Sequence, residues 1–277
     1  MKQFGIISLW LMALPIFAKP YVEGTIKGGL GNQMFQIAAT SALAWDNGAK
    51  PIFPSLKENS RPARHTLHRV DRQKPKKTPS THWQEPSYAF TEIPYSPNMK
   101  LTGYFQSEKY FAKYRKRLLK LFAPHPKDLK HIQKKYKKII NSSKSVGVQI
   151  RYYRREDPTG AIYPQYGSEY LEKAMSLFPP DSRFIVSTDN IDFAKKVMPK
   201  WARHVTYLKG EPDYIDFHLL SLCRHNIITN SSFGWWSAYL NTNPNKIVVC
   251  PSHWVNGLDY RDVIPNRWIG LTADPEN

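Results

Sequence analysis

Two segments of the chain carry residue types that bind phosphate oxygens, and the first is rich in glycine. In GTIKGGLGNQMFQ a strand-like run meets Gly28, Gly29 and Gly31 and then continues as a helix-like run. Glycine permits positive φ and lets backbone N–H groups approach a phosphate or a sugar closely. The segment is not the dinucleotide-binding fingerprint, because Met34 stands where G-x-G-x-x-G requires glycine. A tight strand-to-helix turn is the alternative interpretation.

The second segment is SVGVQIRYYRRED, in which Arg151 directly follows a strand-like run. An arginine offers a planar, permanently charged fork to phosphate oxygens, so Arg151 is a candidate for stabilising negative charge on a leaving phosphate. Glu156 and Asp157 follow it and are the candidates for a general base, since a carboxylate can take the proton of an attacking hydroxyl.

Small polar residues follow two further strand-like runs: Ser187, Thr188 and Asp189 after RFIV, and Asn230, Ser231 and Ser232 after NIIT. In an open parallel sheet, ligands bind beyond the carboxyl ends of the strands. We therefore expect these residues to meet Arg151 and the glycine turn at one edge, where helix N-termini add positive potential. This edge suits a diphosphate attached to a nucleoside. Simple helix capping is the alternative role for Ser231, Ser232 and Asp189.

Strand-like and helix-like runs alternate through the second half of the chain. The predicted strands are 145–151, 183–189, 204–210, 226–230 and 246–251, and the predicted helices are 168–178, 190–198, 213–225 and 231–241. Such alternation predicts a parallel, doubly wound sheet. Ser168 is the expected N-cap of the first of these helices.

The first half is less regular. A strand at 21–27 leads into a helix at 32–48 that Asn47 and Gly48 should end. Residues 54–98 are rich in Pro, Lys, Arg and His and predict a long, irregular, basic surface segment. Basic helices are expected at 108–122 and 127–140. The second should bury a stripe made of Leu129, Ile132, Gln133, Tyr136, Ile139 and Ile140, with its lysines in solvent. We place one α/β domain at 20–143 and a second at 144–277.

Residues 1–19 contain the apolar run FGIISLWLMALPIF, which is shorter than a membrane span requires. A signal peptide cut after Ala18 is the expectation, and an uncleaved N-terminal anchor is the alternative because Ile16 is large for a cleavage site. The protein is therefore expected to be exported or membrane-associated. Action at the cytoplasmic face remains open, because export would separate it from the cytosol.

Composition restricts the partners. The net charge of +18 predicts attraction to anions without selecting one of them, and basic helices are more often solvated than bound to nucleic acid. Cys223 and Cys250 form neither a metal-binding spacing nor a disulfide framework and are expected to be buried thiols. No Asp-x-Asp metal clamp is evident, and His65, His68 and His82 lack ligand spacing. Trp235 and Trp236 are expected in the core.

Several motifs together resemble one enzyme family. GGLGNQMFQ near the start and ITNSSFGWWSAYLN near the end are similar to glycosyltransferase family 11, the α-1,2-fucosyltransferases. FIVSTDN, DFHLLSLCRHNIITNSSFGWW, IVVCPSHWV and VIPNRWI resemble further segments of that family. The resemblance is patchy over 24–48 and nearly continuous over 144–270. One segment departs from the pattern, because Gln149 replaces the histidine of a His-x-Arg motif and an acidic residue comes later, as Glu156 or Asp157.

The resemblance implies a GT-B-like fold of two Rossmann-like domains, with 20–143 on the acceptor side and 144–277 binding the nucleotide sugar, and no required metal or other cofactor. The segment 54–98 is expected to shape the acceptor site. It implies inverting transfer of L-fucose from GDP-fucose, the donor, to a galactose hydroxyl of an acceptor glycan. Arg151 would then stabilise the departing β-phosphate, and Ser231, Ser232 and Phe233 would hold phosphate. Further donor contacts would come from Gly29, Gly31, Asn32, Gln33, Gln149, Asp189 and Asn230. The alternatives are a catalytically degenerate relative that only binds a nucleotide sugar, and a basic protein that binds anionic surfaces.

Overall fold

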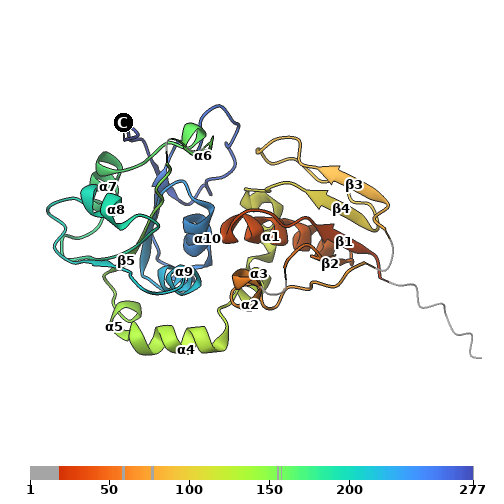
Figure 1. Ribbon diagram of the computed structural model, residues 1–277, viewed down its shortest axis with the longest axis horizontal. Helices are drawn as coiled ribbons and strands as arrows, with labels where there is room; N and C mark the ends of the chain where they lie inside the picture. Colours follow the sequence, from red (N-terminus) through yellow and green to blue (C-terminus); the bar gives the residue numbers. More distant parts are fainter. Residues whose placement is uncertain (1–18, 58–59, 76–77, 155, 157, 277) are drawn as a thin grey trace, which may run out of the picture.

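The strands of this protein form two parallel sheets, one from each half of the sequence (Figure 1). The structure is a computed structural model that describes residues 19–57, 60–75, 78–154, 156 and 158–276. Every strand pairing in both sheets is parallel. The predicted α/β class with parallel sheets is confirmed.

The first sheet has the strand order β2-β1-β4-β3. The elements of this half are β1 (Tyr21–Gly24), α1 (Leu30–Asp46), β2 (Lys50–Ile52), α2 (Arg61–Arg64), β3 (Thr81–Gln84) and β4 (Met99–Thr102). The described part of 54–98 is mostly irregular, but it also contains α2 and β3, which the sequence analysis missed. The residues of β3 are mostly exposed, so no buried alternation marks this strand in the sequence, and its pairing with β4 defines it.

The second sheet has the strand order β10-β9-β8-β5-β6-β7. Its strands are β5 (Ser145–Ile150), β6 (Arg183–Thr188), β7 (Val205–Tyr207), β8 (His225–Ile228), β9 (Val248–Pro251) and β10 (Ile269–Leu271). The helices of this half are α6 (Pro158–Ile162), α7 (Ser168–Met175), α8 (Ile191–Lys196), α9 (Asp213–Ser221) and α10 (Ser232–Leu240). The five predicted strands and four predicted helices are all present. The sequence analysis missed β10, which is short and largely exposed, and α6.

The segment between the sheets is helical but more broken than expected. It contains two 3-10 turns (Glu108–Tyr110 and Ala112–Tyr114) and the helices α3 (Arg115–Leu121), α4 (Pro126–Lys135) and α5 (Lys137–Ile140). The predicted helix 108–122 is interrupted at Phe111, whose φ of −145° is not helical and whose ring stacks on Trp236 at 5.3 Å. The predicted helix 127–140 breaks at Tyr136, and Gln133 is exposed although it was predicted to be buried.

Helices α1 and α10 pack against each other between the two sheets (Figure 1). One apolar cluster includes Val22 and Phe35 from the first half and Trp235, Trp236 and Trp268 from the second. The Phe35 and Trp235 ring centroids lie 4.5 Å apart. The prediction that Trp235 and Trp236 belong to the core is confirmed, since neither is exposed. Because one core joins both halves, the domain boundary near residue 143 stays a prediction.

Three local expectations have clear outcomes. Asn47 caps α1, and Gly48 follows with φ +62°, as predicted. Ser168 is the first residue of α7 and not its N-cap, which is Gly167. Cys223 and Cys250 are buried free thiols, as predicted.

The predicted signal peptide or anchor at 1–19 lies almost entirely outside the described residues. Among the residues that the structure does describe, no helix combines the length and the apolar character that crossing a membrane would require.

Candidate functional site

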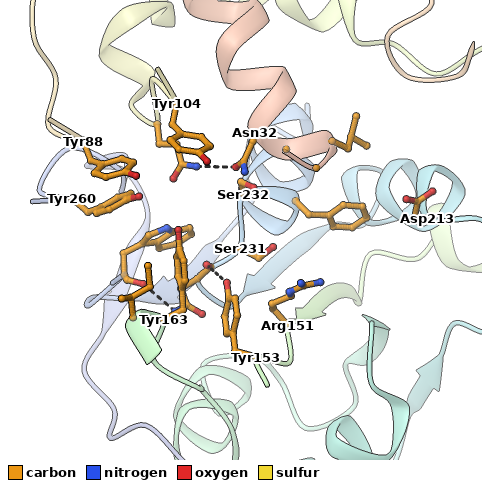
Figure 2. Close-up of a pocket in the computed structure, with 18 residues that line it drawn as sticks. Asn32, Tyr88, Tyr104, Arg151, Tyr153, Tyr163, Asp213, Ser231, Ser232 and Tyr260 are labelled. Carbon is orange, nitrogen blue, oxygen red and sulfur yellow. Dashed lines mark hydrogen bonds between the residues drawn. The ribbon is translucent and has the colours of Figure 1, made fainter. Parts of the chain in front are cut away.

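A cavity of about 460 Å³ opens where the two halves of the protein meet (Figure 2). Its lining comes from both halves and includes polar, aromatic and charged side chains. The lining residues are Gly29, Leu30, Gly31, Asn32, Tyr88, Tyr104, Gln106, Arg151, Tyr153, Ile162, Tyr163, Asp213, Asn230, Ser231, Ser232, Phe233, Trp254 and Tyr260. The glycine turn, Arg151 and the NSSF segment, which are far apart in the sequence, therefore meet at one site, as the sequence analysis expected.

The glycine turn brings the first residues of α1 to the cavity. Gly28 has φ +78°, a conformation that favours glycine, and Gly29 is the extended N-cap of α1. Gln33 Nε2 donates to the Gly28 carbonyl at 2.8 Å, and Gln36 Oε1 accepts from the Lys27 N–H at 2.9 Å. These two bonds stabilise the turn from the helix side. Gln33 does not line the cavity, so the described contacts give it a role in holding the turn.

Two helix N-termini converge on the cavity, those of α1 and α10. Neither helix carries an acidic residue in its first turn. The Ser231 side chain makes no capping hydrogen bond, although Ser231 occupies the N-cap position of α10. Backbone N–H groups at a helix start favour an anion. The arrangement therefore presents two positive helix ends to one ligand-sized space.

Arg151 is held in place beside these helix ends. Its Nη1 lies 2.5 Å from Asp189 Oδ2, and its guanidinium carbon lies 5.6 Å from the centre of the Tyr153 ring. The Arg151 N–H donates to Thr229 Oγ1 at 3.0 Å, and its carbonyl accepts from Gln165 Nε2 at 2.9 Å. The backbone is thus fixed while the guanidinium remains exposed to the cavity. Arg151 is the one lysine or arginine among the described lining residues.

Asn230 and Tyr153 support the α10 side of the cavity. Asn230 Nδ2 donates to the carbonyls of Pro164 and Trp254, both at 3.0 Å, so its amide is used to hold the surrounding loops. Its Oδ1 is buried without a hydrogen-bond partner. The Tyr153 hydroxyl donates to the Asn230 carbonyl at 2.9 Å. These bonds position the loop that leads into Ser231 and Ser232.

Some of the predicted site residues line the cavity and others do not. Those that line the cavity are Gly29, Gly31, Asn32, Arg151, Asn230, Ser231, Ser232 and Phe233. Gln149 lies beneath α10, where its Oε1 accepts from Thr229 Oγ1 at 3.4 Å, and Asp189 reaches the site through Arg151. Asp189 is not the cap of α8, which is Asn190. Glu156 is exposed and does not line the cavity, and Asp157 lies outside the described residues.

The sequence analysis missed the aromatic side of the cavity. Tyr88, Tyr104, Tyr163 and Tyr260 line it together with Tyr153 and Trp254. They come from segments that are distant in the sequence and carry no shared motif, so their spacing gives no signal. It also missed Asp213, the carboxylate among the described lining residues and therefore a candidate base, a position that Glu156 does not occupy.

Asp216 is a second carboxylate that the sequence analysis passed over. It lies one turn after Asp213 on α9, and Ser187 Oγ at the end of β6 donates to its Oδ2 at 3.2 Å. Its Oδ1 is buried without a hydrogen-bond partner. Burial raises the pKa of Asp216 to about 7, and the neighbouring carboxylates of Glu211 and Asp213 add to this effect. Carboxylates with such raised pKa values are concentrated at functional sites.

Replacing Asp216 with asparagine should stabilise the protein at pH 8. The unfolded carboxyl has a pKa of about 3.9, so between pH 4 and 7 the folded state binds the extra proton and the stability falls as the pH rises. Asp216→Asn removes this loss and should raise the free energy of unfolding by ~1–3 kcal/mol at pH 8, with little gain at pH 4.

Urea unfolding at the two pH values measures the effect. Asp192→Asn, an exposed acidic residue in the first turn of α8, is the matched control and should show no such gain. An equal effect of Asp216→Asn at pH 4 and pH 8 would show that ionisation of this carboxyl is not the cause.

The histidines have structural partners. His65 Nδ1 lies 2.7 Å from Asp128 Oδ2, and its ring stacks on Tyr214 at 3.6 Å. His218 on α9 is buried against Thr66, its Nε2 lying 3.2 Å from Oγ1, and burial lowers its pKa to about 3. Among the residues that are described, no group of three or more His, Cys, Asp or Glu side chains is arranged to hold a metal ion.

Comparisons with known proteins agree with this geometry. The family model described as Glycosyl transferase family 11 matches residues 18–272. The O-antigen biosynthesis glycosyltransferase WbnK of Escherichia coli is 29% identical over 62% of this chain and 60% of its own length. An alpha-1,2-colitosyltransferase of Escherichia coli is 26% identical over 90% of this chain and 98% of its own. Galactoside alpha-(1,2)-fucosyltransferase 2 of Oryctolagus cuniculus is 29% identical over 89% of this chain and 75% of its own length.

The fold has a solved counterpart. Fucosyltransferase NodZ from Bradyrhizobium superposes with a TM-score of 0.55 at 14% identity, covering 85% of this chain and 97% of that one. This likeness concerns the fold and supports the predicted GT-B-like architecture. The family model matches nearly the whole chain, and the glycine turn and the NSSF segment meet at one cavity. This protein is therefore a glycosyltransferase that belongs to glycosyl transferase family 11.

Proposed function

We propose that this protein transfers L-fucose from GDP-fucose to a galactose hydroxyl of a glycan, with inversion at the anomeric carbon. The observation that carries the proposal is the convergence of two helix N-termini and Arg151 on one cavity. Relatives that cover about nine-tenths of the chain are galactoside fucosyltransferases, which supports both the donor sugar and the acceptor.

The chemistry requires stabilisation of a departing nucleoside diphosphate. As the bond from the fucose C1 to the β-phosphate oxygen breaks, the electron pair stays on that oxygen and the sugar gains oxocarbenium character. Arg151 and the N–H groups that begin α10 stabilise the growing charge, and the groups that begin α1 lie on the facing wall. The acceptor oxygen attacks C1 from the opposite face. Its proton passes to a carboxylate base, for which Asp213 in the described cavity lining and Asp157 are the candidates.

We assign this charge stabilisation to arginine and helix dipoles without a divalent cation, so no cofactor is required. The positive groups at the cavity support the assignment, since Arg151 and two helix N-termini already offer positive charge to phosphate oxygens. Transfer should therefore continue in EDTA.

A second donor is favoured by one specific observation. An alpha-1,2-colitosyltransferase of Escherichia coli aligns with 90% of this chain and with 98% of its own length. Colitosyl transfer from a GDP-activated donor at the same cavity is the second candidate function. It uses the same phosphate contacts and differs only at the sugar.

Thermal unfolding of the chain with GDP, GDP-fucose, GDP-colitose, GDP-mannose and UDP-galactose, each with EDTA, separates these possibilities. A ligand that binds only the folded state raises its stability by mass action. We expect a rise in Tm with GDP and GDP-fucose that survives EDTA and is absent with UDP-galactose. A larger rise with GDP-colitose would favour the second candidate. Binding without transfer to any galactoside would favour a catalytically degenerate relative, and no rise with any nucleotide would contradict both donors.

For location, we propose attachment to an anionic membrane surface through α3, α4 and α5. These helices carry nine exposed lysine and arginine residues: Lys116, Arg117, Lys120, Lys127, Lys130, Lys134, Lys135, Lys137 and Lys138. Each cation near an anionic bilayer contributes about 1 kcal/mol. Sedimentation with phosphatidylglycerol vesicles should show binding that high salt releases. Equal binding to neutral phosphatidylcholine vesicles would argue against this surface.

A further inference from the structure

Four tyrosines form one continuous side of the cavity, which we call the tyrosine wall: Tyr88, Tyr104, Tyr163 and Tyr260. Tyr88 and Tyr104 belong to the first half of the chain, and Tyr163 and Tyr260 belong to the second. Figure 2 shows Tyr88, Tyr104 and Tyr260 on one side of the cavity, with Arg151 and Asp213 on the other. The wall is thus separated from the group that would hold the donor phosphates.

Ring contacts hold the wall together. Tyr88 stacks on Tyr260 with centroids 4.6 Å apart and on Tyr104 at 5.8 Å. Burial raises the pKa of the Tyr260 hydroxyl, and the neighbouring Tyr163 and Tyr88 add to this effect. Tyr163 stacks on Tyr153 at 5.0 Å, which joins the wall to the loop that carries Arg151. Because each ring is fixed by a neighbour, the hydroxyls are pre-organised and little side-chain entropy is lost on binding.

The polar atoms of the wall face the ligand space. In Figure 2 the hydroxyls of Tyr88, Tyr104 and Tyr260 point toward the side of the cavity where Asn32 and Ser232 lie. Gln106, whose Nε2 donates to Asn32 Oδ1 at 2.9 Å, lines the same region. Among the described lining residues the charged side chains are Arg151 and Asp213, and neither belongs to the wall.

We infer that the tyrosine wall is the acceptor subsite, and that it takes an uncharged sugar next to the reacting hydroxyl. A phenolic hydroxyl both donates and accepts a hydrogen bond, as a sugar hydroxyl does, and the aromatic edges offer apolar contact to the C–H groups of a pyranose. Lys27 Nζ lies 4.4 Å from the centre of the Tyr104 ring but does not belong to the described cavity lining. A carboxylate or sulfate on the acceptor would therefore lose its hydration at the wall with no cation among the wall's own side chains to pair with it. The inference rests on the proposed function, because it assigns the other side of the cavity to the donor.

The sharpest test is Tyr104→Phe. This change keeps the ring stacked on Tyr88 and removes one hydroxyl that faces the cavity. With lactose as acceptor and GDP-fucose as donor, we expect the KM for lactose to rise about fivefold, as the loss of one hydrogen bond predicts, while the KM for GDP-fucose stays constant. Tyr88→Phe should act in the same direction. Tyr114→Phe is the control, because its hydroxyl donates to Asp46 away from the cavity and should leave both constants unchanged.

Charge selectivity gives an independent measurement. Wild-type protein should use lactose at least tenfold more efficiently than 3′-sulfolactose, judged by kcat/KM. Unchanged lactose KM in both Tyr104→Phe and Tyr104→Ala, or an equal rise in the donor KM, would overturn the inference. If the donor proposal itself fails, calorimetric titration of lactose into wild-type and Tyr104→Ala protein still decides the question. Loss of lactose binding in the variant supports the subsite, and equal binding, or none in either protein, rejects it.

Discussion

Replacing Arg151 with alanine is expected to lower kcat for sugar transfer about 10²- to 10³-fold, the usual cost of removing one group that stabilises charge in the transition state. Among the described residues that line the cavity, Arg151 is the one with a basic side chain. Its backbone is fixed by hydrogen bonds to Thr229 and Gln165. GDP affinity should fall as well, because in the proposed function the guanidinium also contacts the diphosphate before the reaction. Steady-state kinetics and GDP titration measure the two effects separately.

Two variants control for the loss of charge in general. Arg151→Lys keeps the positive charge but loses the planar fork, so its activity should lie between those of wild type and Arg151→Ala. Arg154→Ala removes an exposed arginine that does not line the cavity and should keep activity within about twofold. Wild-type activity in Arg151→Ala would show that Arg151 takes no part in the chemistry. Weakened GDP binding in a protein that never transfers sugar would instead identify a degenerate relative.

Gly31→Ala should damage both stability and activity. A Cβ at Gly31 would lie 2.3 Å from the Ser232 carbonyl carbon, 2.5 Å from its oxygen and 2.6 Å from the Phe233 nitrogen. These are backbone atoms of α10, so no side-chain rotation relieves the contact and the two helices must move apart. We expect a loss of at least ~1–3 kcal/mol of unfolding free energy. Displacing the helix ends by about 1 Å should lower kcat about 10²-fold.

The neighbouring glycine provides the matched control. A Cβ at Gly29 has no atom within 4 Å, and its φ of −74° suits any residue. Gly29→Ala should therefore leave the Tm nearly unchanged, and any change in donor KM would report on the space near the ligand. Calorimetric unfolding and donor kinetics of the two variants test the contrast. Equal Tm and activity in Gly31→Ala and wild type would show that α1 and α10 are not held at this distance in solution.

Local patterns in the sequence predicted the second sheet well. The strands β5, β6, β8 and β9 are apolar runs bounded by turns, and β5 is buried at every residue, so hydrophobic periodicity alone identifies them. The first sheet was harder, because β3 is mostly exposed and is defined by its pairing with β4. The break at Phe111 had no local signal either, since it follows from packing of that ring on Trp236.

The residues of the candidate site also differ in whether the sequence could predict them. The glycine turn, Arg151 and the NSSF segment could be predicted because each is a short motif at a strand end, where parallel sheets bind ligands. The positions of Gln149 and Gln33 outside the cavity lining depend on which way each side chain points, which a motif does not specify. The tyrosine wall and Asp216 were missed because their roles come from burial and from partners distant in sequence.

By itself, the sequence determined the fold class, the family and the segments proposed to bind phosphate, because these depend on residue periodicity and on contiguous motifs. Only the tertiary structure decided that Gly31 touches the backbone of α10, that one core joins both halves, and that four tyrosines from separate segments share one side of the cavity. These features arise from contacts between residues that are far apart along the chain. Such contacts are selected by close packing and burial of the whole molecule, so no local stretch of sequence encodes them.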